Sequence, residues 1–200
     1  MSSRIPRIVL ASTSNIRRVL LQRLRIAFDV VPPEYEEEDL GLEPESEALS
    51  RATGKAESVI ETVGDGIIIG SDQLLVVQGN AIPKPTTENA TVHLLRAMKG
   101  IRHSLFTALS VFDTRSERWL NDTVVSSLVI RADISDEEIL RYVRMDQSIG
   151  CAGGYKLESL GICLFSHIDT PDYTAILGMP LISLCDVLRS VGVVIPPLLS

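Results

Sequence analysis

The stretch Gly66-Ile67-Ile68-Ile69-Gly70-Ser71-Asp72-Gln73 (GIIIGSDQ) decides the fold. Three consecutive isoleucines are typical of a strand that is buried on both faces of a sheet. The run nevertheless ends in a carboxylate and an amide. Because ligands of open α/β sheets bind beyond the carboxyl ends of the strands, Asp72 is predicted to stand at a binding site.

Strand and helix patterns alternate on both sides of this stretch. The pattern predicts strands over 5–10, 28–31, 66–71 with a continuation through 74–77, 105–112, 119–129 and 161–168. It predicts helices over 16–24, 45–63, 135–144 and 181–191, and another that is capped by Thr86 or Thr87 and ends near residue 98. Residues 78–80 have the character of a hairpin turn, and the strands 105–112 and 119–129 are expected to be antiparallel. The fold class is therefore α/β or α+β around a mixed sheet.

The composition is that of a soluble globular protein. The 200 residues are 45% hydrophobic and 22% charged, which suits one domain or two tightly joined halves. No apolar run reaches the roughly 18 residues of a membrane span, and residues 1–6 do not resemble a signal peptide, so we expect a cytoplasmic protein without a membrane partner. The cysteines, Cys151, Cys163 and Cys185, are odd in number and lack C-x-x-C spacing, which favours neither disulfides nor a zinc site.

The net charge of −7 argues against general nucleic-acid binding, which requires a basic surface. An anionic ligand must therefore be met by a few local cations. The chain has only four lysines, Lys55, Lys84, Lys99 and Lys156, so the surroundings of each one are informative.

The segment Ala11–Arg18 (ASTSNIRR) predicts a phosphate-binding turn. Two arginines in the first turn of a helix are disfavoured by the helix dipole, and a bound anion would reverse that penalty. Free backbone N–H groups, the hydroxyls of Ser12 and Ser14, and the Arg17 guanidinium together suit a phosphate. A capped surface helix with two solvated arginines is the alternative interpretation.

Two lysines are candidates for further phosphate contacts. Lys55 lies beside the apolar stripe of its helix, so its stem can follow the core while its ammonium reaches a cleft. Lys84 lies between Pro83 and Pro85, which restrict the backbone to extended geometry and fix the direction of the side chain. A lysine in a rigid surface loop is the alternative for Lys84.

Carboxylates near Asp72 complete the pattern. Asp72 can hold a hard divalent cation or accept a proton from a water. Glu36, Glu37 and Glu38 are candidates for a second carboxylate, although such a run is also typical of a solvated loop. Together with the lysines and the arginine turn, these acids favour a metal-assisted reaction on a polyphosphate.

The chain resembles the Maf family of nucleoside triphosphate pyrophosphatases. The resemblance rests on RIVLASTSNIRRVLLQRL, GIIIGSDQ, PKP, LSVFDT, CAGGYKLESLGICLF and ILGMPLISLCDVLR, in family order over residues 5–190. Gln73, the CAG at 151–153 and Glu158 resemble the branch that acts on 7-methyl-GTP. The resemblance implies a Maf-like (anticodon-binding/ITPase-like) mixed sheet flanked by helices, with an antiparallel extension. It implies a single domain over residues 1–200, with two lobes around a central cleft as an option.

Site roles follow from the resemblance, position by position. Asp72 matches the proton acceptor and a metal ligand, and Glu37 matches the acid after the second strand. Arg17, Lys55 and Lys84 match the phosphate-binding cations of the family, and Lys156 is a further candidate. Ile16, Gln73 and Glu158 match the family positions that discriminate the base. Ile16 stands where this branch often has an aromatic residue, and Asn15 stands where the family usually has proline.

The implied function is hydrolysis of a nucleoside triphosphate, such as 7-methyl-GTP, to the monophosphate and pyrophosphate with Mg²⁺ or Mn²⁺. A metal-activated water oriented by Asp72 would attack the α-phosphorus in a house-cleaning reaction. One alternative keeps the chemistry and changes the substrate to dTTP, UTP or CTP. Another is a nucleotide-binding regulator of cell division without catalysis. The resemblance also makes a homodimer plausible.

Overall fold

The computed structural model describes residues 6–37 and 40–197 of the chain. Two compact units are present. The first contains residues up to Asp72, Thr107–Thr123 and residues from Gly178 onward; the second contains Gln73–Phe106 and Val124–Leu177. No helix in the described ranges is long and apolar enough to cross a membrane. Glu38, one of the acids singled out above, lies outside the described residues.

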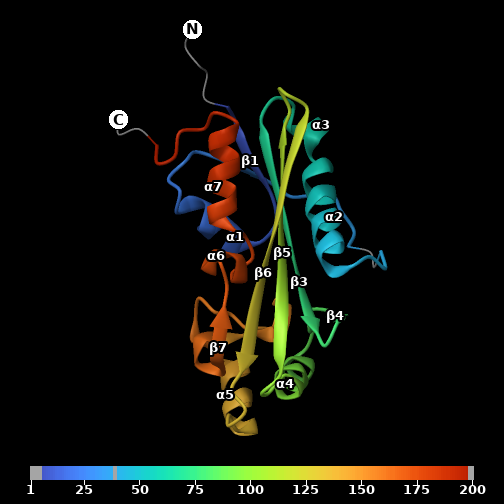
Figure 1. Cartoon of the computed structure of the whole chain (residues 1–200), viewed down its shortest axis with the longest axis vertical. Coiled ribbons are helices and arrows are strands. Elements are labelled where there is room, and N and C mark those ends of the chain that lie inside the picture. The colour runs from blue at the N-terminus through green and yellow to red at the C-terminus, as the bar shows by residue number, and fades with distance from the viewer. Residues whose placement is uncertain (1–5, 38–39, 198–200) are drawn as a thin grey trace. The chain divides into compact units, whose positions relative to one another are not determined.

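The mixed sheet and flanking helices expected from the sequence are confirmed (Figure 1). The sheet has seven strands: six follow the order β2-β1-β3-β5-β6-β7, and the seventh, β4, pairs with β3. Three long strands, β3 (Ile67–Val77), β5 (Arg102–Asp113) and β6 (Arg118–Ile130), contribute residues to both units.

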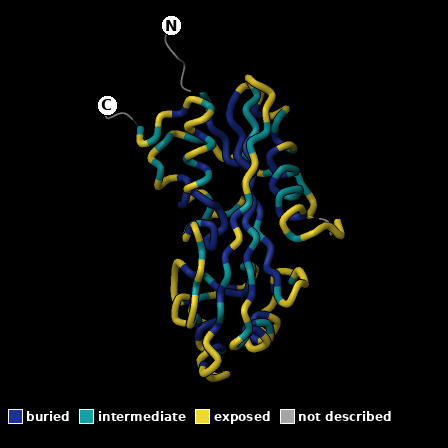
Figure 2. Tube along the Cα trace, in the orientation of Figure 1, coloured by how far each residue is buried: buried dark blue, intermediate teal, exposed yellow. Residues whose placement is uncertain are grey.

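The first unit is built on parallel strands. β1 (Ile8–Ala11) pairs with β2 (Asp29–Val31) on one side and with β3 on the other, in the register Ile8–Ile67 to Leu10–Ile69. The three isoleucines are at most 2% exposed, which confirms the expected doubly buried strand. In Figure 2 the traces of β1 and β3 in this unit have the dark blue colour of buried residues, whereas β2 is largely exposed.

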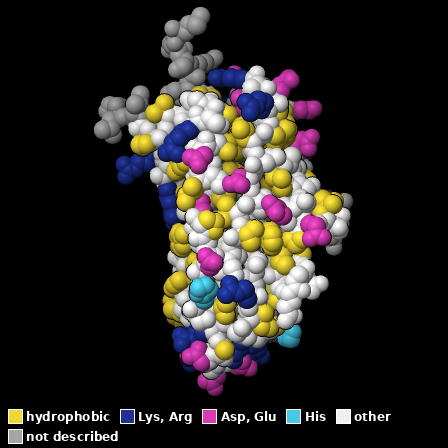
Figure 3. Space-filling model, in the orientation of Figure 1, with side chains coloured by type: hydrophobic (Ala, Val, Ile, Leu, Met, Phe, Trp, Pro, Cys, Tyr) yellow, Lys and Arg dark blue, Asp and Glu magenta, His cyan; other side chains and the backbone are white. Residues whose placement is uncertain are grey.

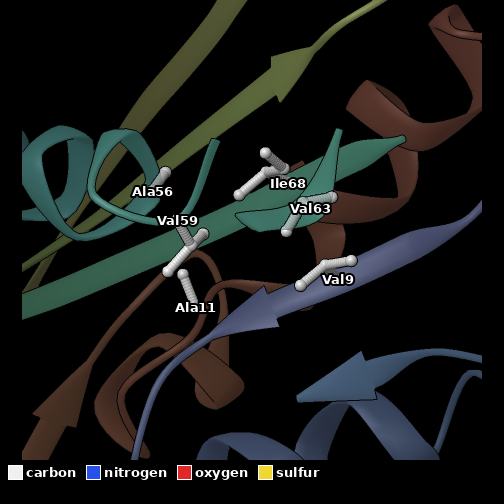
Figure 4. Close-up of a cluster of buried hydrophobic side chains, with 6 residues drawn as sticks. All are labelled: Val9, Ala11, Ala56, Val59, Val63 and Ile68. Carbon is white, nitrogen blue, oxygen red and sulfur yellow. The ribbon is translucent and has the colours of Figure 1, made fainter. Parts of the chain in front are cut away.

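Helices cover both faces of this part of the sheet. Figure 1 shows α2 (Pro44–Glu57) and α3 (Ile60–Val63) on one face, and α1 (Asn15–Gln22) and α7 (Leu181–Ser190) on the other. The core beneath α2 and α3 consists of short aliphatic side chains (Figure 4): Val9, Ala11, Ala56, Val59, Val63 and Ile68. Such small side chains let α2 approach β3 closely.

The predicted long helix over 45–63 is interrupted in the structure. α2 ends before Ser58, and Val59 has φ −110° and ψ 0° before α3 begins. The Ser58 hydroxyl donates to the carbonyl oxygen of Lys55 at 3.0 Å, which is a local hydrogen bond of the type that bends helices. The apolar periodicity continues through the break, and so the sequence pattern did not reveal it.

The second unit combines β4 (Asn80–Ile82) and β7 (Phe165–Asp169) with α4 (Glu88–Ala97), α5 (Asp136–Asp146) and α6 (Tyr173–Ile176). β4 is antiparallel to β3 and β7 is antiparallel to β6, as the predicted antiparallel extension requires. Short 3₁₀ turns occupy Ala152–Gly154 and Leu160–Leu164. The second of these corrects the predicted strand over 161–168, whose first half is helical. Gly161 turns back on Lys156, and a Cβ at Gly161 would lie 2.3 Å from the Lys156 carbonyl oxygen.

His103 makes the stability of the second unit depend on pH. Its ring is 2% exposed, and Nε2 lies 3.2 Å from the Tyr155 hydroxyl. Burial lowers the pKa of His103 below its ordinary value of 6.5, although a hydrogen bond with Ile101 opposes this. The unfolded chain therefore binds more protons than the native protein as the pH falls below 6.5, so stability is lost in that range.

We expect urea unfolding of the wild type to show a free energy that decreases from pH 7 to pH 5.5. The variant His103→Gln, which cannot titrate there but can still bond to Tyr155, should show a smaller decrease. His93→Gln serves as the control, because this substitution does not remove a buried imidazole. Parallel pH profiles for the wild type and His103→Gln would contradict the prediction.

Candidate active site

Asp72 is the centre of a charged cluster in the first unit. The expectation that it ends a strand needs correction, because β3 continues to Val77. Its parallel pairing with β1 stops at Ile69, so Asp72 lies just beyond the last parallel pair. The strand persists because its later residues pair with β4 in antiparallel fashion. Asp72 is fully buried, and its Oδ2 atom has no hydrogen-bond partner among the described residues.

Gly70 lets α2 bring Lys55 to this carboxylate. A Cβ at Gly70 would lie 2.1 Å from the carbonyl oxygen of Ala52, so only glycine permits the observed contact between helix and strand. Gly70 and Asp72 lie on the same face of β3 because side chains alternate along a strand. The Lys55 ammonium donates to Asp72 Oδ1 at 2.6 Å and to Glu37 Oε1 at 2.5 Å. One ammonium therefore bridges two carboxylates that come from different segments.

Arg17 reaches the same cluster from the first turn of α1. Its Nε atom donates to the carbonyl oxygen of Gly178 at 2.8 Å, and the Ser71 hydroxyl lies 2.9 Å from that same oxygen. Burial lowers the pKa of the Arg17 guanidinium, while the negative charges of Asp72 and Glu37 raise it. Arg17 thus lies close enough to both acids for their fields to act on it.

The predicted phosphate turn has the expected caps. Ser14 is the N-cap of α1, and its hydroxyl accepts from the Arg17 N–H at 3.4 Å. The buried Ser12 hydroxyl accepts from the Ser14 N–H at 3.1 Å. Ile16 is half-buried in the same turn. The first unit therefore brings Arg17, Glu37, Lys55 and Asp72 together and holds the serine turn next to Arg17 in the chain.

The remaining candidates belong to the second unit. Three of them, Lys84, Lys156 and Glu158, lie near Cys151. Burial raises the pKa of the Cys151 thiol, the charges of Lys156 and Lys84 lower that pKa, and the charge of Glu158 raises it. The Lys156 ammonium donates to the Asp146 carbonyl oxygen at 2.9 Å. Because these residues and Asp72 lie in different units, the convergence of Lys84 and Lys156 on Asp72 stays a prediction.

Gln73 has a structural task in the second unit. Its Nε2 atom donates to the carbonyl oxygens of Ala175 and Ile176, at 2.9 and 3.1 Å. The amide group therefore holds α6, and base discrimination by Gln73 stays a prediction.

The residues around Asp72 and Glu37 fit a hard divalent cation. Mg²⁺ is commonly bound through one or two carboxylates together with substrate phosphates. Asp72 and Glu37 share one ammonium, and within residues 6–37 and 40–197 the Oδ2 atom of Asp72 is a buried acceptor without a partner. No group of three or more His, Cys, Asp or Glu side chains suited to a metal occurs within the described ranges. Phosphate oxygens and water are the further ligands that such a cation would take.

Two charged residues of this cluster were missed from the sequence. Arg51 forms ion pairs with Glu47 and, at 3.8 Å, with Glu37. The two missed residues, Glu47 and Arg51, form with Lys55 a stripe at every fourth residue of α2. This i, i+4 spacing of opposite charges could have indicated them from the sequence.

Figure 3 shows acidic and basic side chains interspersed over the face that it draws.

Comparisons with known proteins agree with this architecture. A family model described as Maf-like protein matches residues 7–191. A protein of Syntrophotalea carbinolica named 7-methyl-GTP pyrophosphatase is 38% identical, over 93% of this chain and 95% of the relative. A protein of Burkholderia thailandensis with the same name is 40% identical, over 96% and 90%. Among solved structures, the Staphylococcus aureus Ham1 protein covers 92% of this chain and 99% of its own, with a TM-score of 0.53; at 15% identity this likeness shows the fold alone.

Proposed function

The chain belongs to the Maf family, as its motifs predict, and from this premise we propose that it is a nucleoside triphosphate pyrophosphatase. The reaction would release a nucleoside monophosphate and pyrophosphate, which makes the protein a hydrolase of phosphoric anhydrides. The observation that carries the proposal is the contact of the buried Lys55 with both the buried Asp72 and the more exposed Glu37, in a cluster that Arg17 also reaches. A house-cleaning role in the cytoplasm belongs to the same proposal.

In the proposed mechanism, Asp72 orients the attacking water and accepts its proton. Its buried Oδ2 atom has no partner in the part of the chain that the structure describes, and this atom would accept the proton. Arg17 and Lys55 bind the phosphates and offset the charge that develops on them. Asp72 and Glu37 would hold the divalent cation, which supplies charge neutralisation and acidifies bound water. Ser12, Ser14, Lys84 and Lys156 are proposed as further phosphate contacts.

For the base, we propose a 7-methylguanine-like substrate read by Ile16, Gln73 and Glu158. The names of the relatives support this substrate. Ile16 favours the second candidate, a canonical triphosphate such as dTTP, UTP or CTP, because an aliphatic side chain offers no ring on which a cationic methylated base can stack.

A panel of nucleotides tests the proposal. We expect pyrophosphate release to be fastest, in kcat/KM, with 7-methyl-GTP when it is compared with GTP, UTP, CTP and dTTP in the presence of Mg²⁺ and of Mn²⁺. A preference for a pyrimidine would move the assignment to the second candidate. Tight nucleotide binding without any pyrophosphate release would instead support a non-catalytic regulator.

A further inference from the structure

We propose that Arg51, held by Glu47, is a positioning residue that orients the Glu37 carboxylate toward Lys55. The inference rests on the proposed function for its catalytic meaning, since Glu37 is assigned there to the metal. The contacts among these side chains stand independently of that assignment.

The backbone around Glu37 does not fix the orientation of its carboxylate, so other side chains must do so. Residues 32–37 follow β2 without helix or strand. A carboxylate on an irregular segment keeps a fixed direction only when its own contacts define it, because side-chain rotamer freedom must be overcome. The orientation of Glu37 therefore depends on the side chains around it.

Two cations on α2 each lie near a different oxygen of the Glu37 carboxylate. Lys55 Nζ lies 2.5 Å from Oε1, and Arg51 Nη1 lies 3.8 Å from Oε2. Each cation contacts a different oxygen, so the two contacts together restrict rotation of the carboxylate more than either contact does by itself. Two cations one helical turn apart fix the plane of the group, which decides the oxygen that can reach a metal ion.

Glu47 holds Arg51 in turn. Its side chain is 5% exposed and forms an ion pair with Arg51 Nη2 one turn away. A carboxylate this buried adds little to solubility, and its desolvation is tolerated because Arg51 is its partner. By contrast, Glu57 on the same helix is exposed. The buried pair restricts the rotamer of Arg51 and aims its guanidinium at Glu37.

The same loop has a second contact with α2, at Gly54. The Tyr35 ring packs so closely there that a Cβ at Gly54 would lie 2.2 Å from its Cε2 atom. Tyr35 thus anchors the segment that carries Glu37, while Arg51 and Lys55 orient the carboxylate itself. The helix provides a docking face for the loop, made by Glu47, Arg51, Gly54 and Lys55.

Mn²⁺ binding without nucleotide tests the proposal by isothermal titration calorimetry. The variant pair Glu47→Gln/Arg51→Met removes both charges, so no lone buried charge remains to unfold the protein. We expect it to weaken Mn²⁺ affinity about tenfold, as the loss of residues that orient metal ligands does. Arg51→Lys, which keeps a charge that can pair with both acids, should restore most of the affinity. Glu57→Gln/Arg23→Met, which changes two exposed charges in the same unit, should bind Mn²⁺ like the wild type.

A cycle with Glu37→Gln separates positioning from a general structural effect. If Arg51 acts through Glu37, the charge-pair variant should lose no further Mn²⁺ affinity in the Glu37→Gln background. An equal loss in both backgrounds would overturn the proposal, as would the absence of Mn²⁺ binding by the wild type. Coupling in Mn²⁺ affinity combined with no pyrophosphate release by the wild type would leave the positioning role in place and reject the proposed function.

Discussion

Asp72→Asn is expected to lower kcat for pyrophosphate release by about 10²–10⁴-fold, the range that a positioned general base contributes. An amide cannot accept the proton of the attacking water, and it offers a cation a neutral oxygen in place of a carboxylate. The measurement is steady-state release of pyrophosphate from the best nucleotide of the panel, at saturating Mg²⁺.

The fold should survive this change. Asparagine keeps an oxygen that can accept from Lys55, and Lys55 keeps its second partner, Glu37. Urea unfolding should therefore show a native, cooperative protein. Asp186→Asn is the matched control, because Asp186 is an exposed acid on α7 whose side chain is 74% exposed. Turnover by Asp72→Asn close to that of the control would reject Asp72 as the base.

The sequence predicted the central features of the first unit well. The isoleucine run marked β3, and the capping serines marked the start of α1, because burial and capping act on neighbouring residues. Lys55 was identified by its place beside the apolar stripe of a helix. Each of these signals is local, so a single sequence contains it.

Contacts between distant segments were not predictable in the same way. Arg51 meets Glu37 because the loop after β2 packs on α2, where the Tyr35 ring lies against Gly54, and the spacing of residues along the chain does not encode that packing. The break at Ser58 depends on one hydroxyl that bonds back to the helix, and the continuing apolar pattern conceals it. The Nε2 atom of Gln73 donates to the backbone of α6, a contact that the sequence did not indicate, and base discrimination by Gln73 stays a prediction.

Lys55→Met is expected to destabilise the protein by about 3–5 kcal/mol in the absence of metal, as the removal of one partner of a buried ion pair does. Asp72 is fully buried, and the Lys55 ammonium is the hydrogen-bond donor to its Oδ1 atom. Without that donor, neither oxygen of this buried carboxylate would have a hydrogen bond from the described residues, and Glu37 would face Asp72 with like charge. Urea unfolding at neutral pH measures the loss, and Lys99→Met, which removes a lysine paired only at 3.9 Å, should cost far less.

If this electrostatic explanation is correct, either a second substitution or added Mn²⁺ should restore stability to the Lys55→Met variant. Asp72→Asn in the Lys55→Met background removes the uncompensated charge, so the double variant should be more stable than Lys55→Met alone. Mn²⁺ should also raise the unfolding midpoint of Lys55→Met more than that of the wild type, because a cation there no longer competes with an ammonium. A double variant as unstable as Lys55→Met would mean that the lysine stem, through its packing, supports the fold and that its charge does not.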